Sequence, residues 1–287
     1  MSRIAYVNGS YVALRDARVN VEDRGYQFAD AVYEVVAVKD GVFVDEALHL
    51  ARLHRSLAAL AIAPPMSDAA LKTVLREVVR RNGVGEGIVY LQVSRGTAPR
   101  DFAFPRDARP SLVVMARRKG LGDPRLMAEG VGVITIPDIR WARPDIKSVA
   151  LLPNVLGKQQ AKDAGAFEAW QVDRDGNVTE GTSSNAWIVT ASGEVATRRA
   201  DRSILNGVTR QGILQLIAVE GLVLRERPFS VAEAKAAPEA FLTSASNFII
   251  PVVRIDATAI GDGRPGPVTR RLAAAYVGYA SGGGQDR

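Results

Sequence analysis

Two tight-turn dipeptides near the start of the sequence constrain the fold most strongly. Asn8-Gly9 lies between two short strand-like segments, residues 4–6 and 11–14, and Asp40-Gly41 follows a β-branched and aromatic run at residues 31–38. Asn-Gly and Asp-Gly readily adopt the positive φ angles that a two-residue hairpin turn requires. The chain is therefore predicted to begin with two antiparallel β-hairpins.

Helical and strand patterns follow along the rest of the chain. Apolar residues at helical spacing predict a helix from Glu46 until Pro64-Pro65 and a second from Ser67 to Asn82-Gly83. Further helices are predicted at residues 154–164, after Asn206–Arg210, from Ser230 and at 268–279, and strands at 88–94, 111–116, 131–137, 169–172, 186–189, 194–197, 240–243 and 252–255.

The length of 287 residues suggests two domains or one large one. Residues 118–124 combine charge, Gly and Pro, which is typical of a linker. We therefore expect an N-terminal domain at residues 1–117 and a C-terminal domain at 125–287.

Composition removes several classes of function. The net charge of +6 comes from scattered Arg and Lys with no basic stripe among aromatic residues. This favours a general role of the charge in solubility, with attraction of small anionic substrates as the second interpretation, and a basic nucleic-acid-binding protein without catalysis remains a remote alternative. The chain has no cysteine, and His49 and His54 alone do not make a metal site. No apolar run reaches the ~18 residues of a membrane span, so we expect a cytoplasmic location and no membrane partner.

The stretch at residues 178–185 reads Val-Thr-Glu-Gly-Thr-Ser-Ser-Asn and separates two strand-like segments. It places one carboxylate, Glu180, among small hydroxyl groups and beside a glycine. A polar turn has this composition, and so does a loop that presents a carboxylate to a ligand. Both interpretations remain open from these residues alone.

Other chemically useful residues are spread along the chain. Arg52 lies on a helix, Lys147 follows a strand, Gly207-Val208-Thr209 precedes a helix, and Ser244-Ala245 ends a strand. A helix beginning at Gly-Val-Thr offers backbone N–H groups to an anion, although ordinary capping explains it as well. No dinucleotide fingerprint, Walker sequence or nucleophile elbow is present. Pyridoxal 5′-phosphate would use the whole set, because it carries a phosphate, a basic ring nitrogen and an aldehyde.

Six separated motifs resemble the class IV aminotransferases, which are fold-type IV pyridoxal-phosphate enzymes, over about residues 6–276. They are His49-Leu-Ala-Arg52, Asp145-Ile-Lys147-Ser148, Asn154-Val-Leu-Gly-Lys158-Gln159, Thr179-Glu180-Gly-Thr-Ser-Ser-Asn185, Gly207-Val-Thr-Arg210 and Thr243-Ser244. Within the family, Glu22–Phe28, Val32–Val36 and Arg95–Arg100 look most like D-amino-acid aminotransferases. The resemblance implies an α+β fold with a smaller N-terminal α/β domain and a larger C-terminal β-barrel-like domain.

The resemblance also implies roles for individual residues. Lys147, in its Asp-Ile-Lys-Ser context, would form the Schiff base and move the proton, and it is preferred to Lys158 as the catalytic lysine. Glu180 would pair with the ring nitrogen. The remaining cofactor-binding residues would be Arg52, Gly207, Val208, Thr209, Ser244 and Ala245 around the phosphate, Leu205 on the ring, and Ser183 and Ser184 in support.

Tyr33 and Arg100 would face the substrate carboxylate, with Arg100 contributed by the neighbouring subunit of a homodimer. The implied reaction is a ping-pong transfer of the amino group of a D-amino acid such as D-alanine to 2-oxoglutarate, giving pyruvate and D-glutamate. Other activities of the same fold are alternatives: branched-chain L-amino-acid aminotransferase, (R)-amine transaminase and aminodeoxychorismate lyase.

Two positions depart from the pattern of D-amino-acid aminotransferases. Phe102 stands where they have a histidine two residues after the loop arginine, and Ala245 stands where threonine is common. Phe102 removes a donor to the carboxylate and suits apolar substrates as well. Ala245 leaves only a backbone N–H for the phosphate.

Overall fold

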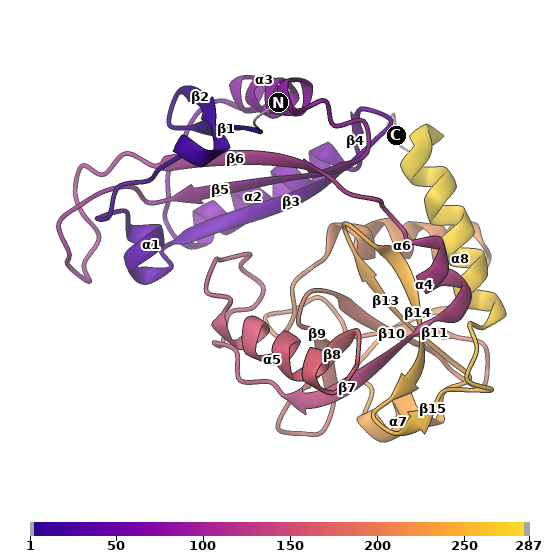
Figure 1. Cartoon of the computed structure of the whole chain (residues 1–287). Coiled ribbons are helices and arrows are strands. Elements are labelled where there is room, and N and C mark those ends of the chain that lie inside the picture. Colours follow the sequence, from indigo (N-terminus) through magenta and orange to yellow (C-terminus); the bar gives the residue numbers. More distant parts are fainter. Residues whose placement is uncertain (1–2, 284–287) are drawn as a thin grey trace. The chain divides into compact units, whose positions relative to one another are not determined.

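The computed structural model describes residues 3–283, and the chain divides into two compact units. Unit 1 comprises Met1–Leu121 and Ile146–Ala150, and unit 2 comprises Gly122–Asp145 and Leu151–Arg287. Each unit contains a β-sheet with helices, so the expectation of a two-domain α+β fold is confirmed (Figure 1). The proposed domain bounds remain a prediction, and their outermost residues lie outside the described part of the chain.

Unit 1 is built on a six-stranded antiparallel sheet in the order β2-β1-β6-β5-β3-β4, whose strands are labelled in Figure 1. Its elements are β1 (Ile4–Val7), β2 (Ser10–Ala13), a 3₁₀ turn (Leu14–Asp16), α1 (Arg24–Phe28), β3 (Ala31–Lys39), β4 (Val42–Phe43), α2 (Glu46–Ala59), α3 (Asp68–Asn82), β5 (Gly87–Ser94) and β6 (Ser111–Arg118).

Both predicted hairpins are present in unit 1. Asn8 and Gly9 have φ of 45° and 98° between β1 and β2, and Asp40 and Gly41 have φ of 52° and 78° between β3 and β4. These are the left-handed conformations that the dipeptides were expected to supply.

The core of unit 1 lies between its sheet and the two long helices. Leu53 of α2 and Leu75 of α3 share one buried cluster with Val36, Leu91 and Val114 of the sheet. The helical spacing of the leucines therefore marks the buried face correctly.

Unit 2 contains a nine-stranded sheet in the order β12-β11-β10-β13-β14-β7-β8-β9, with β15 beside β14. Its elements are α4 (Pro124–Glu129), β7 (Val131–Pro137), α5 (Leu152–Asp163), β8 (Glu168–Val172), β9 (Val178–Gly181), β10 (Asn185–Val189), β11 (Val195–Thr197), α6 (Val208–Val219), β12 (Leu224–Glu226), α7 (Val231–Ala236), β13 (Glu239–Ser244), β14 (Phe248–Ile255), β15 (Thr258–Ala259), α8 (Pro267–Gly278) and a π-type turn (Tyr279–Gly283).

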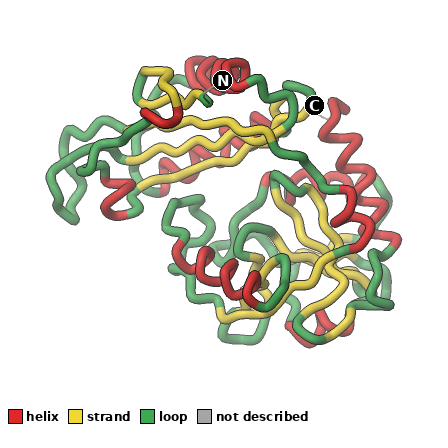
Figure 2. Tube along the Cα trace, viewed as in Figure 1, coloured by secondary structure: helices red, strands yellow, loops and turns green. Residues whose placement is uncertain are grey.

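The sheet of unit 2 is strongly curled (Figure 2). β9 forms one end of the strand order, yet only three residues separate it in sequence from β10, which lies nearer the other end. Such a short connection brings the end of the sheet back towards its middle, which gives the expected barrel-like form.

The sequence patterns missed several short elements. α1 and α4 were not predicted, and neither were β12 and β15. α1 has five residues and α4 six, too few for a helical period to be recognised. Glu180 was expected in a loop and instead lies in β9, because residues 178–181 pair with β8. Among the described residues, no helix is long and apolar enough to cross a membrane.

Candidate active site

Lys147 is held by its main chain against the first half of β3. Tyr33 N donates to Lys147 O at 3.0 Å, and Val149 N donates to Ala31 O at 3.0 Å. Lys147 N donates to the Ser56 hydroxyl of α2 at 3.2 Å. The segment around Lys147 is thereby attached to unit 1 although unit 2 precedes and follows it in sequence.

The side chain of Lys147 lies over an aromatic ring. Its Nζ is 4.1 Å from the centre of the Tyr33 ring, which stacks in turn on Tyr90 at 5.7 Å. Burial, and then the neighbouring Tyr33, raise the pKa of Tyr90 to about 12. In the described part of unit 1, no carboxylate forms an ion pair with Lys147. Its amine can therefore move towards a ligand without breaking an ion pair to a carboxylate.

Lys158, the competing lysine, is already occupied. Its Nζ donates to Phe167 O and lies 3.6 Å from Glu168 Oε1. Glu168 also accepts from the hydroxyls of Ser183 at 2.7 Å and Ser184 at 3.3 Å. The two serines therefore order a buried carboxylate, and Lys158 completes that cluster.

Arg52 belongs to a buried charged cluster on the other side of β3 from Tyr33. Arg52 Nε and Nη2 donate to the two oxygens of Glu34 at 2.8 and 2.7 Å, and His49 Nδ1 lies 2.7 Å from Glu34 Oε2. Burial alone would raise the pKa of Glu34, but the charge and hydrogen bonds of Arg52, together with His49, hold it well below its ordinary value. Burial lowers the pKa of His49, so the imidazole is neutral near pH 7 and donates from Nδ1.

Glu180 is the centre of the corresponding cluster in unit 2. Its carboxylate accepts from Arg140 Nη1, from Asn185 Nδ2 at 3.0 Å and from Leu205 N at 3.1 Å. Asn185 also donates to Leu205 O at 3.0 Å. Burial raises the pKa of Glu180, although Arg140 and the Leu205 N–H oppose the shift. A carboxylate that is fixed in place and made more basic is suited to share a proton with a ring nitrogen.

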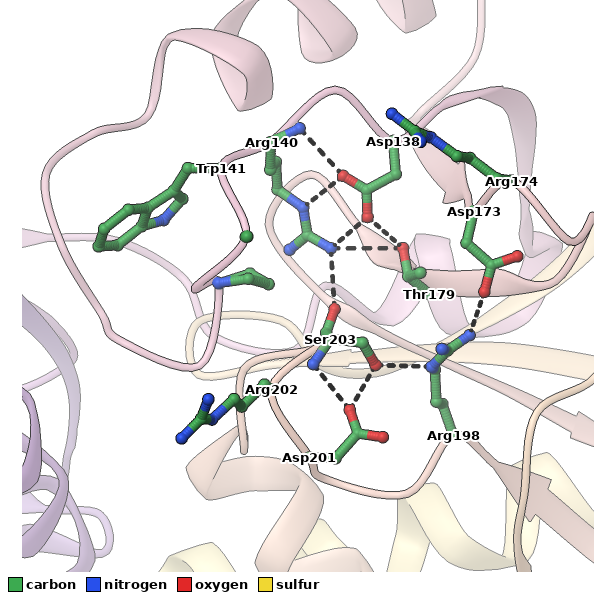
Figure 3. Close-up of a pocket in the computed structure, with 12 residues that line it drawn as sticks. Asp138, Arg140, Trp141, Asp173, Arg174, Thr179, Arg198, Asp201, Arg202 and Ser203 are labelled. Carbon is green, nitrogen blue, oxygen red and sulfur yellow. Dashed lines mark hydrogen bonds and ion pairs between the residues drawn. The ribbon is translucent and has the colours of Figure 1, made fainter.

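Arg140 also lines a pocket of about 540 Å³ (Figure 3). Its Nη2 donates to Asp138 at 2.7 Å, to the Thr179 hydroxyl at 3.3 Å and to Ser203 O at 3.3 Å. Asp138 in turn accepts from Thr179 at 2.8 Å. Asp138, Thr179 and Ser203 thus hold one end of the Arg140 guanidinium. Its Nη1 donates to Glu180. No sequence motif marks Arg140, because it lies 40 residues from its partner Glu180.

The N-terminus of α6 has the properties of an anion site. Gly207 is its N-cap residue and supplies no side-chain cap. A Cβ at Gly207 would lie 2.2 Å from Asn185 Oδ1, so only glycine fits there. Asn185 pairs with Thr243 between β10 and β13, which brings Ser244 to the same region. The Ser244 hydroxyl is buried and has no hydrogen-bond partner in the described structure.

These features fit a phosphate group. The first N–H groups of a 12-residue helix, which include those of Val208 and Thr209, have no intrahelical acceptor and favour negative charge. The Ser244 hydroxyl supplies a donor that the protein leaves unpaired. Ala245 follows Ser244 in the turn between β13 and β14 and has no side-chain donor of its own. Pyridoxal phosphate therefore suits the donors present in unit 2.

The expected substrate residues lie on unit 1. Tyr33 is beside Lys147, as described above. Arg100 lies on the long loop between β5 and β6, with its guanidinium carbon 4.6 Å from the centre of the Phe28 ring. Phe102 packs against the same ring at 5.4 Å and is 83% exposed. Unit 1 thus places Tyr33 and Lys147 together, Arg52 on the other side of β3, and Arg100 on a separate loop.

Comparison with known proteins gives a consistent family. Residues 31–255 match the sequence profile of the amino-transferase class IV family. The chain is 42% identical over 266 residues to a D-alanine aminotransferase of Bacillus licheniformis, which covers 92% of this chain and 93% of that protein. A D-alanine aminotransferase of Staphylococcus haemolyticus is 38% identical over 276 residues, 96% of each chain.

Solved structures with the same fold include branched-chain amino acid aminotransferases. The enzyme of Escherichia coli has a TM-score of 0.93 at 24% identity and covers 100% of this chain and 97% of its own. The enzyme of Thermoproteus uzoniensis, solved with norvaline, has a TM-score of 0.87 at 24% identity and covers 99% and 97%. Another such enzyme, complexed with N-(5′-phosphopyridoxyl)-L-glutamate, has a TM-score of 0.89 at 23% identity and covers 98% and 95%. At 23–24% identity these structures establish the fold of this chain and do not identify its substrate.

Proposed function

This chain belongs to the class IV aminotransferases, and from that premise we propose that it is a pyridoxal-phosphate-dependent D-amino-acid transaminase. It moves the amino group of a D-amino acid such as D-alanine to 2-oxoglutarate and yields pyruvate and D-glutamate. The likeness to D-alanine aminotransferases along nearly the whole chain carries this proposal. The family assignment also makes the protein an enzyme rather than a non-catalytic nucleic-acid-binding module.

Different residues of the site react with the substrate, adjust the cofactor ring and bind the cofactor phosphate. When bound, pyridoxal phosphate supplies an aldehyde that links to an amine and a ring that draws electrons from the substrate Cα. Lys147 provides the amine, and its Nζ then takes the Cα proton. Glu180 holds a proton at the ring nitrogen. Val208, Thr209 and Ser244 bind the phosphate, and Leu205 is positioned through its backbone contacts with Glu180 and Asn185.

The experiment that tests the activity is a chiral assay of the purified holoenzyme with 2-oxoglutarate. We expect D-alanine to be consumed and D-glutamate to form, while L-leucine and (R)-1-phenylethylamine react far more slowly. Chiral chromatography of the glutamate product gives the result directly. Consumption of L-leucine with formation of L-glutamate, and no reaction of D-alanine, would instead identify a branched-chain L-amino-acid aminotransferase. Preference for the amine would identify an (R)-amine transaminase.

We further propose a homodimer in which Arg100 serves the active site of the neighbouring subunit. Its support in unit 1 is a set of exposed aromatic side chains near Arg100: Tyr26 of α1 is 76% exposed, Phe102 83% and Phe104 61%. Large apolar side chains exposed together often mark a protein interface. Arg100 itself is exposed, and a guanidinium can bind a carboxylate with two parallel hydrogen bonds.

Mixed dimers test whether Arg100 acts across the interface. Lys147→Ala and Arg100→Ala subunits carrying different tags are co-expressed, and the heterodimer is purified through both tags. If Arg100 acts on the neighbouring site, the heterodimer has one native site, and we expect about half of the wild-type activity from one of two sites. If Arg100 acts within its own subunit, no native site forms and activity stays as low as in the parent variants. Measuring kcat/KM with D-alanine distinguishes these outcomes.

A further inference from the structure

The loop that carries Arg100 is fixed by the segment that precedes β3. On the N-terminal side of Arg100, Ala98 N donates to Glu22 O at 3.3 Å, and Arg24 N donates to Gly96 O at 2.9 Å. These contacts join two backbones, so they set the course of the loop independently of most side chains.

On the other side of Arg100, the loop is held by the side chain of Arg24. Arg24 Nη1 donates to Asp101 O at 2.5 Å, and Nη2 lies 3.4 Å from Phe102 O. Its remaining nitrogen, Nε, donates to Asp30 at 2.8 Å. Arg24 is only 3% exposed, so these contacts are shielded from water. Arg100 therefore lies between two anchored points of the loop.

Asp30 orients Arg24 by accepting from its Nε. The same carboxylate accepts from Arg95 Nε at 2.7 Å and Nη2 at 3.0 Å. Burial alone would raise the pKa of Asp30, but the hydrogen bonds and charges of Arg95 and Arg24 lower it below the ordinary value. Asp30 is therefore an anion between two buried arginines. Arg95 also donates to Leu60 O at 2.7 Å and Ala61 O at 2.8 Å, which ties this cluster to the end of α2.

The Phe28 ring links Arg24 with Arg100. The guanidinium carbons of Arg24 and Arg100 lie 4.8 and 4.6 Å from the centre of this ring. Phe102 packs beside it. In the described part of unit 1, no carboxylate pairs with Arg100. A guanidinium that rests on an aromatic ring keeps its N–H edge free for a carboxylate.

We propose that Arg24 is a positioning residue for Arg100. It holds the loop backbone just beyond Arg100 and contacts the Phe28 ring on which the Arg100 guanidinium lies, so that this guanidinium is in place before a substrate carboxylate arrives. The inference rests on the proposed function, because it requires Arg100 to bind that carboxylate. In this chain, which lacks the loop histidine, the arginine is fixed from within its own subunit by aromatic packing and by Arg24.

The test is a double-mutant cycle on the holoenzyme with Arg24→Lys, Arg100→Ala and the double variant. Lysine keeps the charge beside Asp30 but cannot bridge it to two loop carbonyls. We expect Arg24→Lys to raise KM for D-alanine and 2-oxoglutarate by about tenfold while kcat stays within about twofold. In the Arg100→Ala background the same change should raise KM by less than about twofold, because the residue through which Arg24 acts is gone. Arg106→Lys, an exposed arginine of the same loop, is the matched control and should leave both constants unchanged.

Each outcome separates the inference from the proposed function. An Arg100→Ala variant with unchanged KM would remove Arg100 from the substrate site, and the inference would fall with it. A raised KM in Arg100→Ala together with an unchanged KM in Arg24→Lys would overturn the inference alone, and so would additive effects in the double variant. If Arg24→Lys does not fold, Phe28→Leu tests the ring contact in the proposal, because it removes the ring that links Arg24 with Arg100 and leaves the Arg24 to Asp30 pair; an unchanged KM in Phe28→Leu would then overturn the inference. Absence of D-alanine turnover in the wild type would count against the proposed function.

Discussion

Lys147→Ala is expected to lower the rate of amino-group transfer by about 10⁴-fold or more, because it removes both the linking amine and the base that takes the Cα proton. The fold should tolerate the change. The contacts that hold this segment are made by its backbone, with Tyr33 N and the Ser56 hydroxyl. Melting temperature and cofactor content therefore accompany the rate measurement as checks on the folded protein.

The rate is measured in a single half-reaction of the loaded enzyme with D-alanine, which avoids any contribution from the second substrate. Lys158→Ala is the comparison variant, since Lys158 was the other candidate lysine. Its amine is engaged by Phe167 O and Glu168, so we expect its half-reaction to slow by less than about tenfold. The reverse order of effects would assign the catalytic role to Lys158.

Glu180→Ala is expected to lower kcat by about 10³-fold, the size typical of losing one pre-oriented electrostatic group. The carboxylate is fixed by Asn185 and Leu205 N before any ligand binds. Its removal also leaves Arg140 paired with Asp138 as its one remaining carboxylate among the described residues, so one negative charge is lost beside the ring nitrogen and its protonated form is disfavoured. In Glu180→Gln, kcat should fall nearly as far, because glutamine keeps the shape of the side chain and removes its negative charge.

Cofactor affinity should change much less than turnover in the Glu180 variants, because the phosphate donors of α6 and Ser244 are intact. Titration of the apoenzyme with pyridoxal phosphate, followed by absorbance, measures this affinity. Glu239→Gln is the matched control: Glu239 is a buried carboxylate of the same unit that accepts from Val268 N at 3.0 Å and Thr269 N at 2.8 Å. We expect normal kcat in this control. Retained turnover with lost cofactor in Glu180→Ala would contradict the electronic role.

Local sequence patterns predicted much of the fold. The hairpins followed from turn dipeptides, and α2 and α3 followed from apolar residues at helical spacing. A helix was expected from Ser230, and the Ser230 hydroxyl caps it by accepting from Glu233 N at 3.0 Å. These features depend on residues close in sequence. Elements such as α1 and β12 are short, and tertiary contacts stabilise them more than local preference does.

The residues of the candidate site also fall into those that the sequence predicted and those that it did not. Motif resemblance pointed to Lys147 and Glu180, but the residues that orient such groups were not visible. Arg140 reaches Glu180 across 40 positions, and Arg24 reaches the carbonyl of Asp101 across 77. An ion pair or hydrogen bond between distant residues leaves no periodic signal in one sequence. The sequence shows that Phe102 stands where related enzymes have histidine. That Phe102 packs on Phe28 is seen in the structure alone.

Borohydride reduction of the loaded enzyme, followed by digestion and mass spectrometry, tests the central claim most directly. Reduction converts the bond between the cofactor and its lysine into a stable amine, so the modified peptide identifies the residue. We predict that the protein is yellow, that reduction bleaches the colour, and that the phosphopyridoxyl group is found on Lys147. Modification of Lys158, or a loaded protein in which no lysine is modified, would contradict it.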